Sequence, residues 1–167
     1  MKFFLRVVVV IALAALGFWA WTAFFPSPEK IVRNRLARLA RDVSFSAGEN
    51  NLVKIADAQS VPTFFASNVE VNIEVPGHQR ETLMGRDDIQ TAALASRQQM
   101  SQLAVKFPDV NVTVAPDRNS ALADVTLDAT ISGQQDAIIQ ELKITFQKGD
   151  GQWLISTVQT VQAVSKF

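Results

Sequence analysis

Apolar and polar residues alternate one by one through much of the second half of this sequence. From Ala121 to Ile131 every odd-numbered position is apolar, and the positions between them are largely polar. These polar positions are Asp124, Thr126, Asp128 and Thr130. A period of two predicts a strand with one buried and one solvated face. The same period predicts a mostly antiparallel sheet with further strands over residues 69–75, 103–114, 138–146 and 153–164.

Three other segments have the spacing of helices. Ser27 suits an N-cap, Pro28 suits the first helical position, and Glu29 suits the positive end of the helix dipole. We therefore expect a helix over residues 28–42. Its apolar stripe would consist of Val32, Leu36, Leu39 and Val43. Further helices are expected over residues 52–65 and 85–100, and a hairpin that turns at residues 76–79 is expected between them.

Four local motifs accompany this order of elements: Phe64–Ser67, Val75–Gly77, Gly85–Ile89 and the closing run Gly151–Ser156. Together with the order of elements, they resemble the nuclear transport factor 2-like superfamily, which includes ketosteroid isomerases and polyketide cyclases. The resemblance covers about Ser27 to Val164. It implies an α+β fold in which three helices pack on a curved, mostly antiparallel sheet to form a cone around a pocket. It also implies a tendency to form homodimers through the sheet, but it implies no activity, because such folds host many functions.

An uncharged apolar segment of nineteen residues, Val7 to Phe25, precedes this domain. As a helix it would span about 28 Å, nearly the thickness of the hydrocarbon core of a bilayer. Trp19 and Trp21 suit the aromatic belt at the far interface. The sequence therefore predicts a transmembrane signal anchor over residues 1–26 and the cone-shaped domain over residues 27–167. The alternative is a secretory signal that is cleaved.

Basic residues are concentrated at the N-terminal end. The first 41 residues hold seven Lys and Arg against one acidic residue, whereas the remaining residues hold nine basic and fifteen acidic ones. The acidic body disfavours nucleic acid as a partner. Lys2 and Arg6 favour a cytoplasmic N-terminus, although the basic residues that follow the span argue for the opposite orientation. We expect a single-pass protein of the cell membrane with its C-terminal domain in the periplasm.

Two groups of polar residues are candidates for surface contacts. Arg33, Arg35 and Arg38 follow the span closely enough to contact anionic lipid headgroups, or they form a solvated helix face. The polar face of the strand over residues 121–132 is either a partner surface or a solvated sheet face. Its candidate partner residues are Asp124, Thr126, Asp128 and Thr130.

Residues for known chemistries are scarce. The chain has no Tyr, which ketosteroid isomerase chemistry needs in its oxyanion hole. The resemblance places the base of those enzymes near Ile73, which is apolar. The single histidine, His78, lies in a predicted turn, and the chain has no Cys. No spacing of ligands predicts a metal or another cofactor, and no glycine-rich loop predicts phosphate binding.

These observations predict a membrane-anchored, non-catalytic binding or assembly module that displays a pocketed domain outside the cytoplasm. Its expected partners are the membrane, through residues 7–25, and an envelope protein, a small apolar ligand or a second copy. The alternative is an enzyme of the isomerase, cyclase or hydrolase type that acts on a small apolar molecule in the pocket. A carboxylate that faces the pocket with a raised pKa would favour the enzyme.

Overall fold

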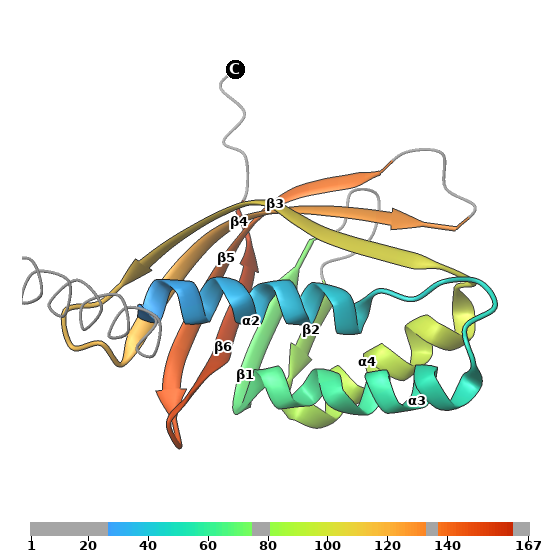
Figure 1. Ribbon diagram of the computed structural model, residues 1–167, viewed down its shortest axis with the longest axis horizontal. Coiled ribbons are helices and arrows are strands. Elements are labelled where there is room, and N and C mark those ends of the chain that lie inside the picture. Colours follow the sequence, from blue (N-terminus) through green and yellow to red (C-terminus); the bar gives the residue numbers. More distant parts are fainter. Residues whose placement is uncertain (1–26, 75–80, 133–136, 162–167) are drawn as a thin grey trace, which may run out of the picture.

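The computed structural model describes residues 27–74, 81–132 and 137–161 (Figure 1). Its helices are α2 (Pro28–Val43), α3 (Asn51–Ser60), the short 3-10 helix η1 (Val61–Phe64) and α4 (Gly85–Gln99). Its strands are β1 (Phe65–Ile73), β2 (Glu81–Met84), β3 (Leu103–Val114), β4 (Ser120–Ile131), β5 (Ile138–Gly149) and β6 (Gln152–Thr160).

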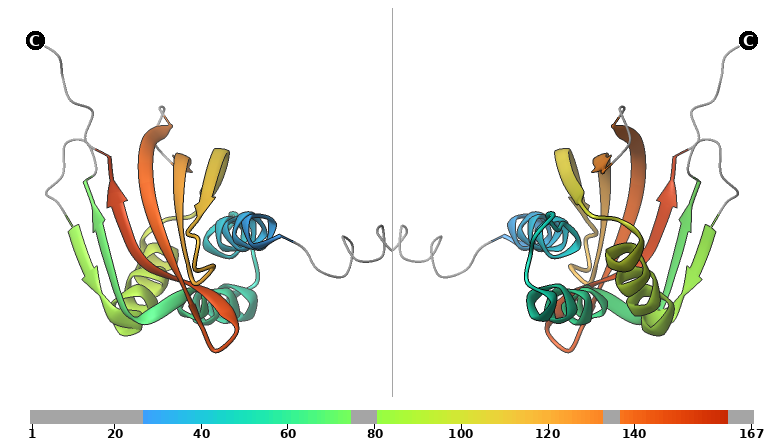
Figure 2. Two further views of the ribbon diagram at one scale, coloured as in Figure 1. Left: turned by 90° about the vertical axis from the view of Figure 1, so that its left-hand side faces the viewer. Right: turned by 90° about the vertical axis from the view of Figure 1, so that its right-hand side faces the viewer.

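The six strands form one sheet in the order β2-β1-β6-β5-β4-β3. Only β1 and β6 pair in parallel, and all other neighbours are antiparallel. The sheet is curved, and the three α-helices lie together on one side of it (Figure 2). The predicted α+β architecture, with three helices on a curved and mostly antiparallel sheet, is therefore confirmed for the described part of the chain.

The first helix is set up by its own sequence. The Ser27 hydroxyl accepts a hydrogen bond from the backbone N–H of Lys30, so Ser27 is the N-cap and Pro28 begins the helix as predicted. Val32, Leu36 and Leu39 are buried along one side of α2. This side packs mainly against β3, and the burial of the stripe holds α2 on the sheet.

The predicted helical stretch over residues 52–65 is divided in the structure between α3 and η1. The helix α3 ends at Ser60, and the chain continues as the 3-10 turn η1 because Pro62 has no N–H to extend the hydrogen-bond ladder. The strand β1 then starts at Phe65, four residues before the predicted start. Its first two residues are both buried, so no alternation marks them in the sequence. The register of β3 with β4 shifts between Lys106 and Asp109, where Pro108 has no N–H to donate to the neighbouring strand.

Gly85 joins β2 to α4 in a tight connection. Its φ of +77° lies in the left-handed region, and a Cβ atom there would sit 3.4 Å from the Ser67 carbonyl oxygen. The Asp88 carboxylate accepts a hydrogen bond from the Met84 N–H at 2.9 Å, which satisfies one free donor at the start of α4. These contacts fix the direction in which α4 crosses the sheet.

The predicted membrane segment, with Trp19 and Trp21, lies outside the described residues. None of the helices in the described ranges is both long enough and apolar enough to cross a bilayer.

Candidate ligand-binding cavity

A cavity of about 420 Å³ lies between the helices and the inner face of the sheet. Its walls come from α2, α4 and all six strands, so residues distant in the sequence share one hollow. Its helical residues include Leu39, Ala40, Val43, Ile89, Ala92, Ala93, Ser96 and Met100. The strands add residues that include Val71, Ile73, Leu83, Val105, Phe107, Leu127, Ala129, Ile138, Gln140, Leu142 and Ile144. The pocket implied by the resemblance is therefore present as a cavity.

The lining of this cavity is almost entirely apolar. Among the described residues that line it, none is acidic or basic, and only Ser96 and Gln140 have polar side chains. The Ser96 hydroxyl donates to the Ala93 carbonyl at 2.9 Å, so its proton is already used within α4. Such a wall can exclude water and hold an apolar molecule, but its described side chains provide no group that titrates near neutral pH.

Gln140 is a polar residue at a buried position of β5, where the alternation otherwise places apolar residues. It points to the buried face of β5 together with Leu142 and is only 9% exposed. Its Nε2 donates to the backbone carbonyl of Glu74, whereas its Oε1 is buried and has no hydrogen-bond partner among the residues that the structure describes. The sequence signal for it is a polar residue at a position where the alternation of β5 calls for an apolar one.

The position that the resemblance assigns to a catalytic base is part of the cavity wall. Ile73, near the end of β1, lines the cavity and presents only methyl and methylene groups. The single histidine, His78, lies outside the described residues. The catalytic role therefore stays unassigned.

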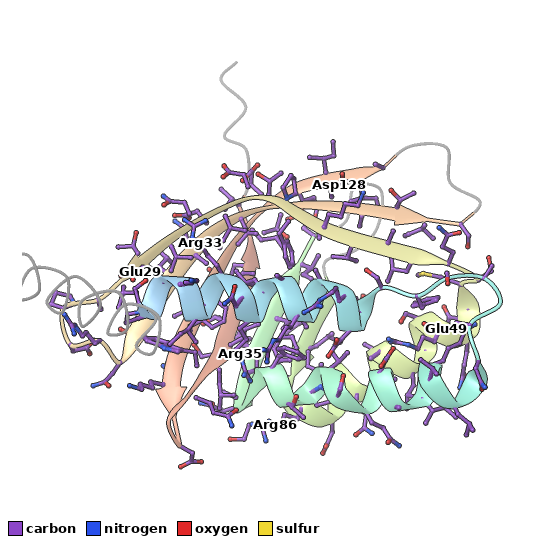
Figure 3. The ribbon with its side chains drawn as sticks, viewed as in Figure 1. Glu29, Arg33, Arg35, Glu49, Arg86 and Asp128 are labelled. Carbon is purple, nitrogen blue, oxygen red and sulfur yellow. The ribbon has the colours of Figure 1, made fainter. Side chains whose placement is uncertain are left out.

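The three arginines predicted to contact the membrane differ in their surroundings. Arg33 donates to the backbone carbonyl of Val110, and Arg35 donates to that of Thr63 at 2.7 Å while lying 5.1 Å from the centre of the Phe64 ring. Arg38 is exposed. Figure 3 shows Arg33 and Arg35 leaving α2 on different sides. Contact with lipid stays a prediction for all three, and two of them also tie α2 to the rest of the domain.

Arg35 is half-buried and close to other cations. Burial lowers the pKa of its guanidinium, and the charges of Arg38 and Arg86 lower it further. It also lines a wider hollow of about 960 Å³ at the start of α2, to which Glu29, Arg118 and Lys148 contribute charges of both signs. This hollow includes Ser27, so it adjoins the point where the predicted anchor meets the domain.

The four predicted partner residues share the outer face of the sheet, away from α2, as Figure 3 shows for Asp128. Asp124 lies opposite Lys143 in register, with 3.9 Å between the charged atoms. Thr126 donates to the Glu141 carboxylate at 2.8 Å. Asp124 and Thr126 therefore already pair with side chains of β5. A dimer through this face remains a prediction, and its interface would include the exposed Ile139, opposite Asp128, beside these polar residues.

A buried arginine joins α4 to the end of α2, and the sequence analysis did not single it out. Arg97 on α4 is 8% exposed, donates to the Asp42 and Ala93 carbonyls, and lies 5.2 Å from the centre of the Phe45 ring. Burial lowers the pKa of its guanidinium, although the charges of Asp57, Glu49 and Asp42 oppose this shift. No periodic pattern distinguishes this arginine from a solvated one in the sequence.

Comparison with known proteins supports the fold. No protein-family model matches this chain, and no curated protein matches it. Among solved structures, an NTF2-like protein of unknown function from Pseudomonas putida has a TM-score of 0.60 at 12% identity, over 81% of this chain and 86% of that one. A putative scytalone dehydratase from Novosphingobium aromaticivorans has a TM-score of 0.58 at 12% identity, over 80% and 83%.

A protein with a cystatin-like fold from Caulobacter vibrioides also matches, with a TM-score of 0.58 at 17% identity over 80% of this chain and 89% of that one. The described domain thus has the NTF2-like, or cystatin-like, fold. At these identities the likeness shows the fold alone.

Proposed function

We propose that this protein is a membrane-anchored, non-catalytic binding module that holds a small apolar molecule in the cavity of its domain. The observation that carries this proposal is the cavity wall, whose described side chains are apolar except for Ser96 and Gln140. A volume of about 420 Å³ falls within the range of small-molecule sites. An apolar molecule that leaves water for this space gains the free energy of burying its surface.

The enzyme alternative has less support. General acid–base catalysis needs a side chain that can give or take a proton within hydrogen-bond reach of the substrate. The described residues of the wall offer an amide and a hydroxyl, and neither titrates near neutral pH. The structural relative described as a putative scytalone dehydratase supports an enzyme only through the shared fold.

Filling the cavity tests the binding function. Ala93 lines the cavity from α4, so Ala93→Phe places a ring in the space that the ligand needs. We expect at least a tenfold weaker binding of an apolar probe such as 2-naphthol, because the displaced volume removes most of its contacts. Equilibrium dialysis of the full chain in detergent, against a chamber with detergent alone, measures this binding.

A matched variant separates filling from the mere addition of a ring. Thr91 is exposed on the same helix, so Thr91→Phe adds the same ring outside the cavity and should leave binding unchanged. Equal binding by wild type and Ala93→Phe would contradict the proposal. Both variants should keep the circular dichroism spectrum of the wild type.

The anchor and the compartment need a separate test. Alkaline phosphatase and a fluorescent protein, each fused after Phe167, report opposite compartments. We expect phosphatase activity that stays in the membrane fraction, because residues 7–25 would remain as an uncleaved span. A shortened, soluble fusion with phosphatase activity would show that the N-terminal segment is a cleaved signal and not an anchor. Fluorescence without phosphatase activity would place the domain in the cytoplasm.

A further inference from the structure

We propose that Gln140 sets the specificity of the cavity, and that its Oε1 selects an apolar, uncharged molecule that carries a hydroxyl group. This inference rests on the proposed binding function and names the ligand class for the same site. It starts from one buried oxygen that has no hydrogen-bond partner among the described residues, in a wall whose only other described polar side chain is Ser96.

The hydrogen bond at the other end of the amide fixes its orientation. The Nε2 of Gln140 donates to the Glu74 carbonyl, which joins β5 to the residue that follows β1. Exchanging the nitrogen and oxygen would bring two acceptors together, so Oε1 is the atom left without a partner. The free group at this point of the wall is therefore an acceptor and not a donor.

An unpartnered amide oxygen in an apolar environment is unfavourable. A buried polar atom without a hydrogen bond loses the hydration that it would have in water. The last torsion of a glutamine side chain has broad energy wells, so the amide can tilt toward a ligand with little strain. A ligand that brings a donor to this oxygen supplies the hydrogen bond that it lacks among the described residues.

The other polar side chain of the wall has the same preference. The Ser96 proton is engaged with the Ala93 carbonyl, so the Ser96 oxygen can accept from a ligand without first breaking a hydrogen bond. Both polar side chains thus offer acceptors. A carboxylate would meet two oxygens and lose its hydration, whereas an ammonium ion would lose its hydration for one or two neutral acceptors. A neutral hydroxyl is the group that fits.

A pair of probes tests this selection directly. 2-Naphthol and 2-methoxynaphthalene share one ring system, but only the first donates a hydrogen bond. We expect the wild-type full chain in detergent to bind 2-naphthol about tenfold more tightly, as one well-made hydrogen bond predicts. The amount of probe bound in the cavity is the amount bound by wild type minus the amount bound by Ala93→Phe. This subtraction cancels the probe that partitions into the detergent.

Removal of the acceptor should remove the preference. Gln140→Met keeps the length of the side chain without an amide, so we expect the ratio between the two probes to fall below about twofold. Equal affinities of wild type for both probes would overturn the role of Gln140 while leaving the binding function intact. An absence of cavity binding for both probes would instead overturn the binding function. The comparison on wild type stands even if Gln140→Met does not fold.

Discussion

Replacement of Phe146 by alanine is expected to lower the free energy of unfolding by about 3–5 kcal/mol. Phe146 lies in β5, has an exposed fraction of 0%, and faces Ala121 and Ile155 across the neighbouring strands. It does not line the cavity. Truncation there leaves a closed void that the surrounding strands cannot fill, because hydrogen bonds to β4 and β6 hold β5 on both sides.

A second phenylalanine provides the control. Phe107 on β3 is partly buried and lines the cavity, so Phe107→Ala enlarges an existing hollow and should cost about 1–2 kcal/mol. Urea denaturation of the full chain, followed by circular dichroism, measures both values. Similar costs for the two variants would mean that the interior around Phe146 relaxes as easily as the cavity wall. Phe107→Ala should also change the affinity for 2-naphthol, because Phe107 lines the cavity. Phe146 lies outside the cavity wall, so Phe146→Ala should act mainly on stability.

The elements could be predicted where a single face is buried. Val125 and Ala129 are buried on β4, and Asp124 and Thr130, which flank this pair, are exposed, so the period of two in the sequence matches the burial in the structure. The helix α2 was predictable for the same reason, since one stripe meets the sheet and Ser27 and Pro28 mark its start.

The pairing of the strands could not be predicted in this way. The neighbours β1 and β6 are about ninety residues apart and pair in parallel, with Val71 opposite Val158. Local alternation reports which face of a strand is buried, but it does not report which strand lies beside it. The resemblance predicted helices packed on a curved sheet around a pocket, whereas the order of the strands is known only from the structure.

The candidate site was harder to predict than the fold. Polar and charged side chains there bond to backbone carbonyls of distant segments, whereas such side chains usually face solvent. Gln140 occupies an apolar position of β5, and its partner, the Glu74 carbonyl, is 66 residues away. Arg33 and Arg35 have the spacing of solvated or lipid-facing cations, yet each donates to a carbonyl on another element. Such partners are set by the tertiary structure, so neither composition nor periodicity contains them.

Arg97 should have the next largest effect on stability, and for electrostatic as well as packing reasons. Its guanidinium donates to the Asp42 carbonyl at the end of α2, and Phe45 packs against it. The carboxylates of Asp57, Glu49 and Asp42 are close enough to favour its charge. Removal of the cation leaves a partly buried carbonyl without its donor and three acidic groups without a nearby positive charge.

We therefore expect Arg97→Met to lower the free energy of unfolding by about 2–4 kcal/mol, although methionine fills much of the same space. Arg97→Lys keeps the charge but has no planar fork to bond two carbonyls while stacking on Phe45, so it should lose about half as much. Urea denaturation gives the two values, and hydrogen exchange should show faster exchange in α4 than in β4 or β5. A loss below about 1 kcal/mol for Arg97→Met would mean that the desolvation of the guanidinium already cancels its contacts. In that case the junction of α2, α3 and α4 would depend on apolar packing around Phe45 instead of on the cation.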